Sequence, residues 1–258
     1  TLVLNWGTGL AADKLLLQGG TIELYNGSGT YHELNTAITV DGSGLIKGSS
    51  NGNSTVLKGS ITGTGTLSFE RINDNPIEIE SAMTDGAEGA LSVNIGNANI
   101  VYAGAKRYTG GTTIGDGGML TVISGGQEGG MVGIVDVYGT LKLNAGDATG
   151  WGDSINTIST INLYKGGVLN VAVTDNQTGS GIAINLQGGE MTGVAGSNFD
   201  LAYGGSARGH STITALAATG ATADNPTVSS IDTVSITLRQ HTNVFEVQEN
   251  AQLNVLSN

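Results

Sequence analysis

The chain has no cysteine and only 2 prolines in 258 residues. Without cysteine, neither a disulfide framework nor a thiolate metal site can form. A lack of cysteine is common in proteins that bacteria export, because it prevents mispairing in an oxidising periplasm. The scarcity of proline and the lack of a Gly-x-y period exclude a collagen-like triple helix.

Basic residues are also scarce, because 10 Lys and Arg face 22 Asp and Glu, for a net charge of −12. Binding to nucleic acid or to an anionic membrane surface depends on clustered Lys and Arg, so neither is expected. No apolar run exceeds about five residues, which is too short for a membrane-spanning helix. We therefore predict no nucleic-acid partner and no direct insertion of this chain into a membrane.

Glycine is abundant, at 43 residues, where ordinary usage is roughly 7%. Hydrophobic residues still make up 38% of the chain, enough to build a core rather than a disordered segment. They alternate with polar residues, as in Leu91-x-Val93-x-Ile95 and Ile182-x-Ile184-x-Leu186. Period-two alternation with glycine between the runs predicts short β-strands throughout.

The strands recur as a unit: apolar-x-apolar, a short glycine-bearing turn, then apolar-x-apolar again. The first apolar residues after successive turns are Ile22, Leu45, Leu67, Ile100, Leu120, Leu141, Leu169 and Met191. Five of the seven intervals are 20–23 residues, and the longer two, of 33 and 28, are interpreted as a rung plus an inserted loop. The 62 residues from Met191 to Leu253 are interpreted as three further units.

A period of this length is typical of a solenoid, in which stacked rungs share one core. We predict an all-β fold, a right-handed parallel β-helix of about 20–23 residues per rung. A Greek-key sandwich also has many short strands, but it does not account for the repeated unit. Residues 1–258 are expected to form a single domain, with a looser, loop-rich segment at 197–230. Because the chain opens in mid-pattern at Thr1, we interpret it as a fragment or mature form of a larger exported protein.

Residues 108–122, YTGGTTIGDGGMLTV, carry a more specific pattern. They resemble the autotransporter-associated β-strand repeat of bacterial passenger domains, and Met119 departs from its usual threonine. The matching positions are Tyr108, Thr109, Gly110, Thr112, Ile114, Gly117, Leu120 and Val122. The resemblance implies a right-handed β-helix that is secreted or held at the outer-membrane surface of a bacterium. It implies no particular activity, since such passengers serve as adhesins, stalks and enzyme carriers.

An acidic segment between Glu70 and Glu88 is the candidate for chemistry. Glu78 and Glu80 alternate with two isoleucines, so both carboxylates are expected on the solvent side of one strand. With Asp74, they could act as an acid/base pair of a hydrolase. The alternative interpretation is a solvated face whose charges discourage stacking of sheets. A bound Ca²⁺ is compatible with these carboxylates, but the repeat-wide Ca²⁺ motif is absent.

The aromatic residues, 5% of the chain, suggest a binding role. Trp151 and Asp153 lie in the inserted loop of the 28-residue interval and are the predicted ligand-binding residues, since an exposed ring can stack on a sugar. Tyr138 and Tyr164 both directly precede their turns and are expected to stack in register. The three histidines are far apart in sequence and lack metal-ligand spacing, so no metal site and no cofactor are predicted.

Three functions remain open on the sequence alone. The leading prediction is a cell-surface adhesion or structural module that binds extracellular glycans or glycoproteins, without catalysis. The alternative is a degradative hydrolase of polysaccharide or glycoprotein, for example mucin, that uses the paired carboxylates. The third is a passive stalk with no ligand.

Overall fold

The structure, a computed structural model, describes residues 1–5, 14–25, 32–48, 55–72, 74–151, 157–178, 181–202, 210–238 and 243–256. Within these ranges every regular element is a β-strand. The described residues therefore include no helix that could cross a membrane.

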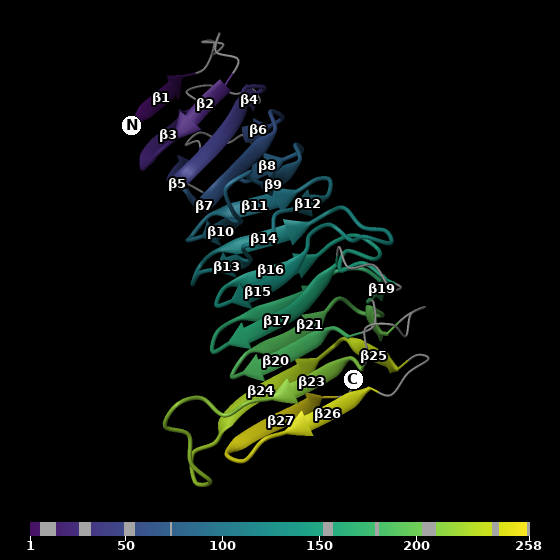
Figure 1. The fold of residues 1–258 in the computed structure, drawn as a ribbon. Helices are drawn as coiled ribbons and strands as arrows, with labels where there is room; N and C mark the ends of the chain where they lie inside the picture. The colour runs from purple at the N-terminus through teal and green to yellow at the C-terminus, as the bar shows by residue number, and fades with distance from the viewer. Residues whose placement is uncertain are drawn as a thin grey trace.

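The strands build three sheets, two of which run along an elongated body while the third is confined to its C-terminal turns (Figure 1). The central path of the 14-stranded sheet, sheet A, comprises β1 (Leu2–Asn5), β3 (Gly20–Tyr25), β5 (Ala37–Lys47), β7 (Ile61–Glu70), β10 (Leu91–Ile95), β13 (Thr112–Ile114), β15 (Gly133–Val137), β17 (Ile158–Tyr164), β20 (Ala183–Gln187), β23 (Thr212–Ala215) and β26 (Val244–Val247). Off this path, sheet A also holds β2 (Lys14–Leu17), β9 (Met83–Asp85) and β12 (Lys106–Arg107).

The other two sheets complete each turn. The 10-stranded sheet, sheet B, comprises β4 (His32–Leu34), β6 (Thr55–Leu57), β8 (Ile77–Ile79), β11 (Asn99–Tyr102), β14 (Met119–Val122), β16 (Thr140–Leu143), β18 (Val168–Val171), β21 (Glu190–Gly193), β24 (Thr227–Asp232) and β27 (Ala251–Leu256). The 3-stranded sheet comprises β19 (Asn176–Gln177), β22 (Asn198–Leu201) and β25 (Ser235–Leu238). The strands of each sheet pair in parallel, as a solenoid requires, so the predicted all-β parallel solenoid is confirmed.

The chain passes from sheet A to sheet B and then along a third side before it returns to sheet A. In the C-terminal turns this third side is the 3-stranded sheet. In the N-terminal turns it is made by β2, β9, β12 and the first halves of β5 and β7. Both long strands bend at opposed glycines, Gly42 and Gly65, and continue into sheet A without a break.

The register of sheet B matches the period that the sequence predicts. Ile100, Leu120, Leu141, Leu169 and Met191 pair directly with one another, turn after turn. The long interval between Leu141 and Leu169 is an insertion, because residues 144–157 link β16 to β17. The predicted period therefore identifies one column of side chains along the axis of the solenoid.

Two parts of the predicted register are wrong. Ile22 and Leu67 lie in sheet A, so the 33 residues from Leu67 to Ile100 mark a change of sheet, not an inserted loop. Ile22 also pairs with Ile46, not with its neighbour Leu45. After Met191 the column continues through Ile231 and Val255, so this interval holds two turns, not three. Apolar alternation alone does not show which sheet a strand joins.

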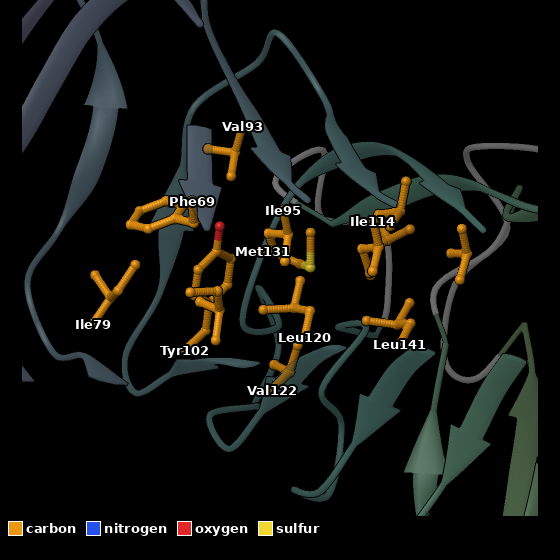
Figure 2. Packing of buried hydrophobic residues seen from close by; sticks show 14 of the residues in the cluster. Phe69, Ile79, Val93, Ile95, Tyr102, Ile114, Leu120, Val122, Met131 and Leu141 are labelled. Carbon is orange, nitrogen blue, oxygen red and sulfur yellow. The ribbon is translucent and has the colours of Figure 1, made fainter. Parts of the chain in front are cut away.

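The core is a continuous column of side chains between the sheets (Figure 2). Phe69, Ile95 and Ile114 enter it from sheet A, and Tyr102 and Leu120 enter it from sheet B; all five have a relative exposure of 0%. Each turn buries its inward side chains only because turns on both sides cover them. Full burial of one such side chain stabilises the fold by about 1.5–3 kcal/mol.

The segment that resembles the passenger repeat uses its pattern residues in the structure. Tyr108 is buried, and its hydroxyl lies 2.9 Å from the Tyr102 hydroxyl and 2.5 Å from Thr112 Oγ1. A Cβ at Gly110 would lie only 2.6 Å from the Leu91 carbonyl oxygen, so this position requires glycine. The pattern thus specifies a buried hydrogen-bonded group and a close approach between successive turns.

A lysine is buried beside this group. Lys106 has an exposure of 0%, and its Nζ donates to the carbonyl oxygens of Ile79 at 2.9 Å and Gly104 at 3.0 Å. The ammonium also lies 5.2 Å from the centre of the Tyr102 ring, within cation–π range. Burial, and to a smaller extent the charge of Arg107, lowers the pKa of Lys106 to about 8.

Candidate functional site

The predicted carboxylates lie along the outside of the solenoid. Ile77 and Ile79 are buried, so Glu78 faces outward from β8, while Glu80 is exposed just after it. Asp74 is exposed and forms an ion pair with Arg71. The structure therefore supports the predicted outward direction of Glu78, whereas Asp74 has a partner of its own.

Glu78 and Glu80 both raise the pKa of a lysine in the preceding turn. Lys58 Nζ lies 2.6 Å from Glu33 Oε1, and this bond raises the pKa of Lys58. The charges of Glu80 and Glu78 add to the same effect. An exposed ion-pair group of this kind is expected on a solvated face, and the catalytic role of Glu78, Glu80 and Asp74 remains a prediction.

Asp85, at the end of the acidic segment, holds two turns together. Its carboxylate accepts hydrogen bonds from the Leu91 and Thr109 backbone N–H groups at 2.8 and 2.9 Å, and from the Thr109 hydroxyl at 2.7 Å. Burial favours the neutral acid, but these three bonds outweigh it and lower the pKa of Asp85. No group of three or more potential metal-ligating side chains occurs in the described ranges.

Trp151 lies in the insertion between β16 and β17, as the spacing predicts. The residue is half-buried, and its backbone N–H donates to the Gln127 carbonyl oxygen at 3.0 Å. Asp153 lies outside the described residues. The assignment of Trp151 and Asp153 to ligand binding therefore remains a prediction.

A different surface combines aromatic rings with hydrogen-bonding groups. Tyr138 and Tyr164 lie where the chain leaves sheet A for sheet B in successive turns, and their rings stack in parallel. The ring centres are 4.3 Å apart and the planes differ by 6°. This confirms the predicted stacking, and Tyr138 is 41% exposed.

A ladder of polar side chains runs beside the two rings. Two residues before each tyrosine, on the same outer face, stand Asp136 and Asn162, and Asn185 follows in the next turn. Asn162 Nδ2 donates to Asp136 Oδ1 at 2.7 Å, and Asn185 Nδ2 donates to Asn162 Oδ1 at 2.8 Å. We call these five residues the tyrosine face.

The Tyr164 hydroxyl remains protonated at neutral pH. It donates to Asp136 Oδ1 over 3.4 Å, and burial followed by the Asp136 charge raises the pKa of Tyr164. The face therefore offers amide donors, carboxylate and amide acceptors, and a phenol, beside a flat apolar surface.

A hollow of about 450 Å³ opens next to this face. Gln187 is the register partner of Tyr164, and Lys165, Gln187 and Gly188 line one wall. The opposite wall is made by residues 218–221, 225 and 226 of the loop 216–226, which projects from the body between β23 and β24 (Figure 1). We call this the loop hollow.

Side-chain hydrogen bonds hold the projecting loop in place. Gln187 Nε2 donates to the Ala217 carbonyl oxygen at 3.1 Å, and the Thr227 hydroxyl accepts from the Ala218 N–H at 2.8 Å. Gly188 N–H donates to Ser229 Oγ at 2.9 Å. The loop hollow is thus a built feature of the corner between sheets A and B.

The sequence contains the residues of this site, but only the register of the strands shows that they lie side by side. Asp136, Asn162 and Asn185 belong to separate alternating runs, and nothing in the runs themselves aligns them. The projecting loop lies within the segment 197–230 that the sequence predicts to be loop-rich, but composition cannot show where such a loop folds back.

Comparisons with known proteins leave the family open. No protein-family model and no curated protein matches the sequence. Among solved structures, a crystal structure of the TibC-catalysed hyper-glycosylated TibA55-350 fragment aligns over 98% of this chain and 97% of the other. The identity is 15% and the TM-score is 0.23, values at which the likeness carries no argument about function.

Proposed function

We propose that this chain is a β-helical module of an exported bacterial protein, secreted or displayed at the cell surface, that binds extracellular glycans or glycoproteins. The export and location rest on the passenger-like repeat at 108–122. The glycan binding rests on one observation, the tyrosine face beside the loop hollow.

The chemistry of this face suits a sugar ring. The C–H bonds of a pyranose ring carry partial positive charge and pack against the electron-rich face of an aromatic ring. The hydroxyls around the ring act both as donors and as acceptors, which matches the amides of Asn162 and Asn185. The stack of Tyr138 on Tyr164 restrains both rings, so little side-chain freedom is lost on binding.

This site binds by surface recognition and needs no catalysis. The tyrosine rings would contact the apolar side of one sugar, the ladder would hydrogen-bond its hydroxyls, and the loop hollow would take a neighbouring unit. Weak single sites of this kind gain avidity when a surface protein displays many copies.

Binding of the full chain to mucin and to a panel of soluble oligosaccharides tests the proposal. We expect retention on at least one glycan and a loss of about tenfold or more in affinity for Tyr138→Ala and Tyr164→Ala, because each removes one ring of the stack. Trp151→Ala is the matched aromatic control. Loss of binding in the Trp151 variant alone would move the site to the loop that the sequence predicts.

The same incubation tests the hydrolase. New reducing ends or peptide fragments that disappear in the Glu78→Gln, Glu80→Gln double variant would establish catalysis by those carboxylates. Binding without products would leave the module as a binding protein, and neither binding nor products would leave the passive stalk.

A further inference from the structure

The loop hollow contains one charged side chain, Lys165. The residue is exposed, and its ammonium forms no ion pair with any other residue in the described ranges. The rest of the lining consists of glycine backbone, small side chains and amides such as those of Gln187 and Asn225. An unpaired cation thus faces a neutral hollow.

The surroundings of this lysine are acidic. A smaller hollow of about 280 Å³ shares Gly188 and Val228 with the loop hollow, and its charged lining residue is Glu190. On the other side, Asp136 gives the tyrosine face a carboxylate. The carboxylates of Glu190 and Asp136 repel an anionic ligand at the two neighbouring surfaces and Lys165 attracts it in the loop hollow, which favours one direction for the ligand.

We propose that the loop hollow holds the carboxylate of an acidic sugar, a uronic or sialic acid, against Lys165, while a neutral sugar of the same glycan stacks on the tyrosine face. This inference rests on the proposed glycan binding and adds the class of ligand. The ammonium supplies a charge-assisted hydrogen bond to the carboxylate, and the amides around it suit the hydroxyls of the same ring.

Affinities for matched sugar pairs test the inference. One pair is lactose with and without a terminal sialic acid, and the other is cellobiose with and without oxidation of its terminal sugar to a uronic acid. In dilute buffer we expect at least one acidic member to bind about fivefold more tightly than its neutral partner, the size of one exposed ion pair. The advantage is expected to shrink as salt is added.

Variants separate this inference from the proposed function. Lys165→Gln should remove the preference for the acidic sugar, so that the acidic and neutral members of a pair bind with equal affinity. Lys14→Gln, which removes an exposed lysine on the first turns, is the charge-matched control and should change neither. The inference is overturned if the preference survives Lys165→Gln or if the wild type shows no preference. In either case, binding of the neutral sugars still supports the proposed site. No binding of any sugar overturns both.

Discussion

At the scale of single residues, two charged side chains connect neighbouring turns in opposite ways: Lys106, which is buried, and Asp85, which is partly buried. The Asp85 carboxylate accepts bonds from backbone N–H groups, and the Lys106 ammonium donates to backbone carbonyl oxygens. Each bonds to backbone groups at or beyond the ends of strands, where the sheet ladders stop. The pKa shifts of the two groups have different causes. Burial lowers the pKa of Lys106, whereas the hydrogen bonds of Asp85 outweigh its burial and lower its pKa.

Lys106 predicts a measurable pH dependence of stability. Its pKa is about 8 in the folded chain and 10.5 as a free side chain, so between these pH values the unfolded chain binds more protons. Stability from this residue therefore rises with pH through that window, by up to about 3 kcal/mol. Urea unfolding of wild type and Lys106→Met from pH 7 to 10.5 should show the difference between them move in favour of wild type. Parallel curves would contradict the buried charge.

At the scale of elements, glycines allow long strands to turn a corner while staying paired. Gly42 in β5 and Gly65 in β7 are register partners, and both have positive φ, +81° and +105°. They differ in space: a Cβ at Gly42 would meet nothing within 4 Å, whereas a Cβ at Gly65 would collide with the Gly42 carbonyl oxygen. Gly42 is required for its backbone conformation alone, whereas Gly65 is required both for its conformation and for the close approach of the neighbouring strand.

Alanine at the two positions should have unequal effects. Gly42→Ala costs only the strained φ, about 1–2 kcal/mol of unfolding free energy. Gly65→Ala adds a backbone collision that the paired strands cannot relieve without a shift, so we expect a loss of roughly 3 kcal/mol or more. Denaturant unfolding of both variants measures the difference. Equal losses would show that the corner relaxes freely.

The sequence predicts the elements better than it predicts their assembly. Alternation gives the strands and the period gives the column from Ile100 to Met191, because both depend on local pattern. The change of sheet after Leu67 was missed because strands of sheets A and B have the same alternation. The stack of Tyr138 and Tyr164 was predictable from their equivalent places before a turn, while the Asp136–Asn162–Asn185 ladder and the loop hollow depend on register and on the fold of an insertion.

At the scale of the whole molecule, position along the axis decides how well a core residue is covered. Inward-facing side chains of the middle turns, such as Val122, have exposures near 0%. In the last described turn, Phe245, Val247 and Val255 continue the inward columns but are 45%, 53% and 68% exposed. Since each turn contacts only its neighbours, local stability should fall toward this end.

A pair of valine variants tests this gradient. Val122→Ala in β14 should lower the free energy of unfolding by roughly 2 kcal/mol, because it leaves a cavity between two covering turns. Val255→Ala in β27 makes the same chemical change at an exposed site and should stay within about 0.5 kcal/mol. Equal effects in urea titrations would mean that the C-terminal turn is covered in solution.

At the corner that carries the tyrosine face, the length of the connection between sheets A and B does not affect the register of the sheets. Between Met191 and its partner Ile231 the chain makes the long excursion of residues 216–226, yet the ladder of sheet B resumes in register. After Tyr138, the chain makes the same crossing with a single glycine before β16 begins. The scaffold thus accepts segments of very different length at one edge without disturbing the core. Loops of different length can therefore be exchanged at this edge while the rungs that hold them keep their register.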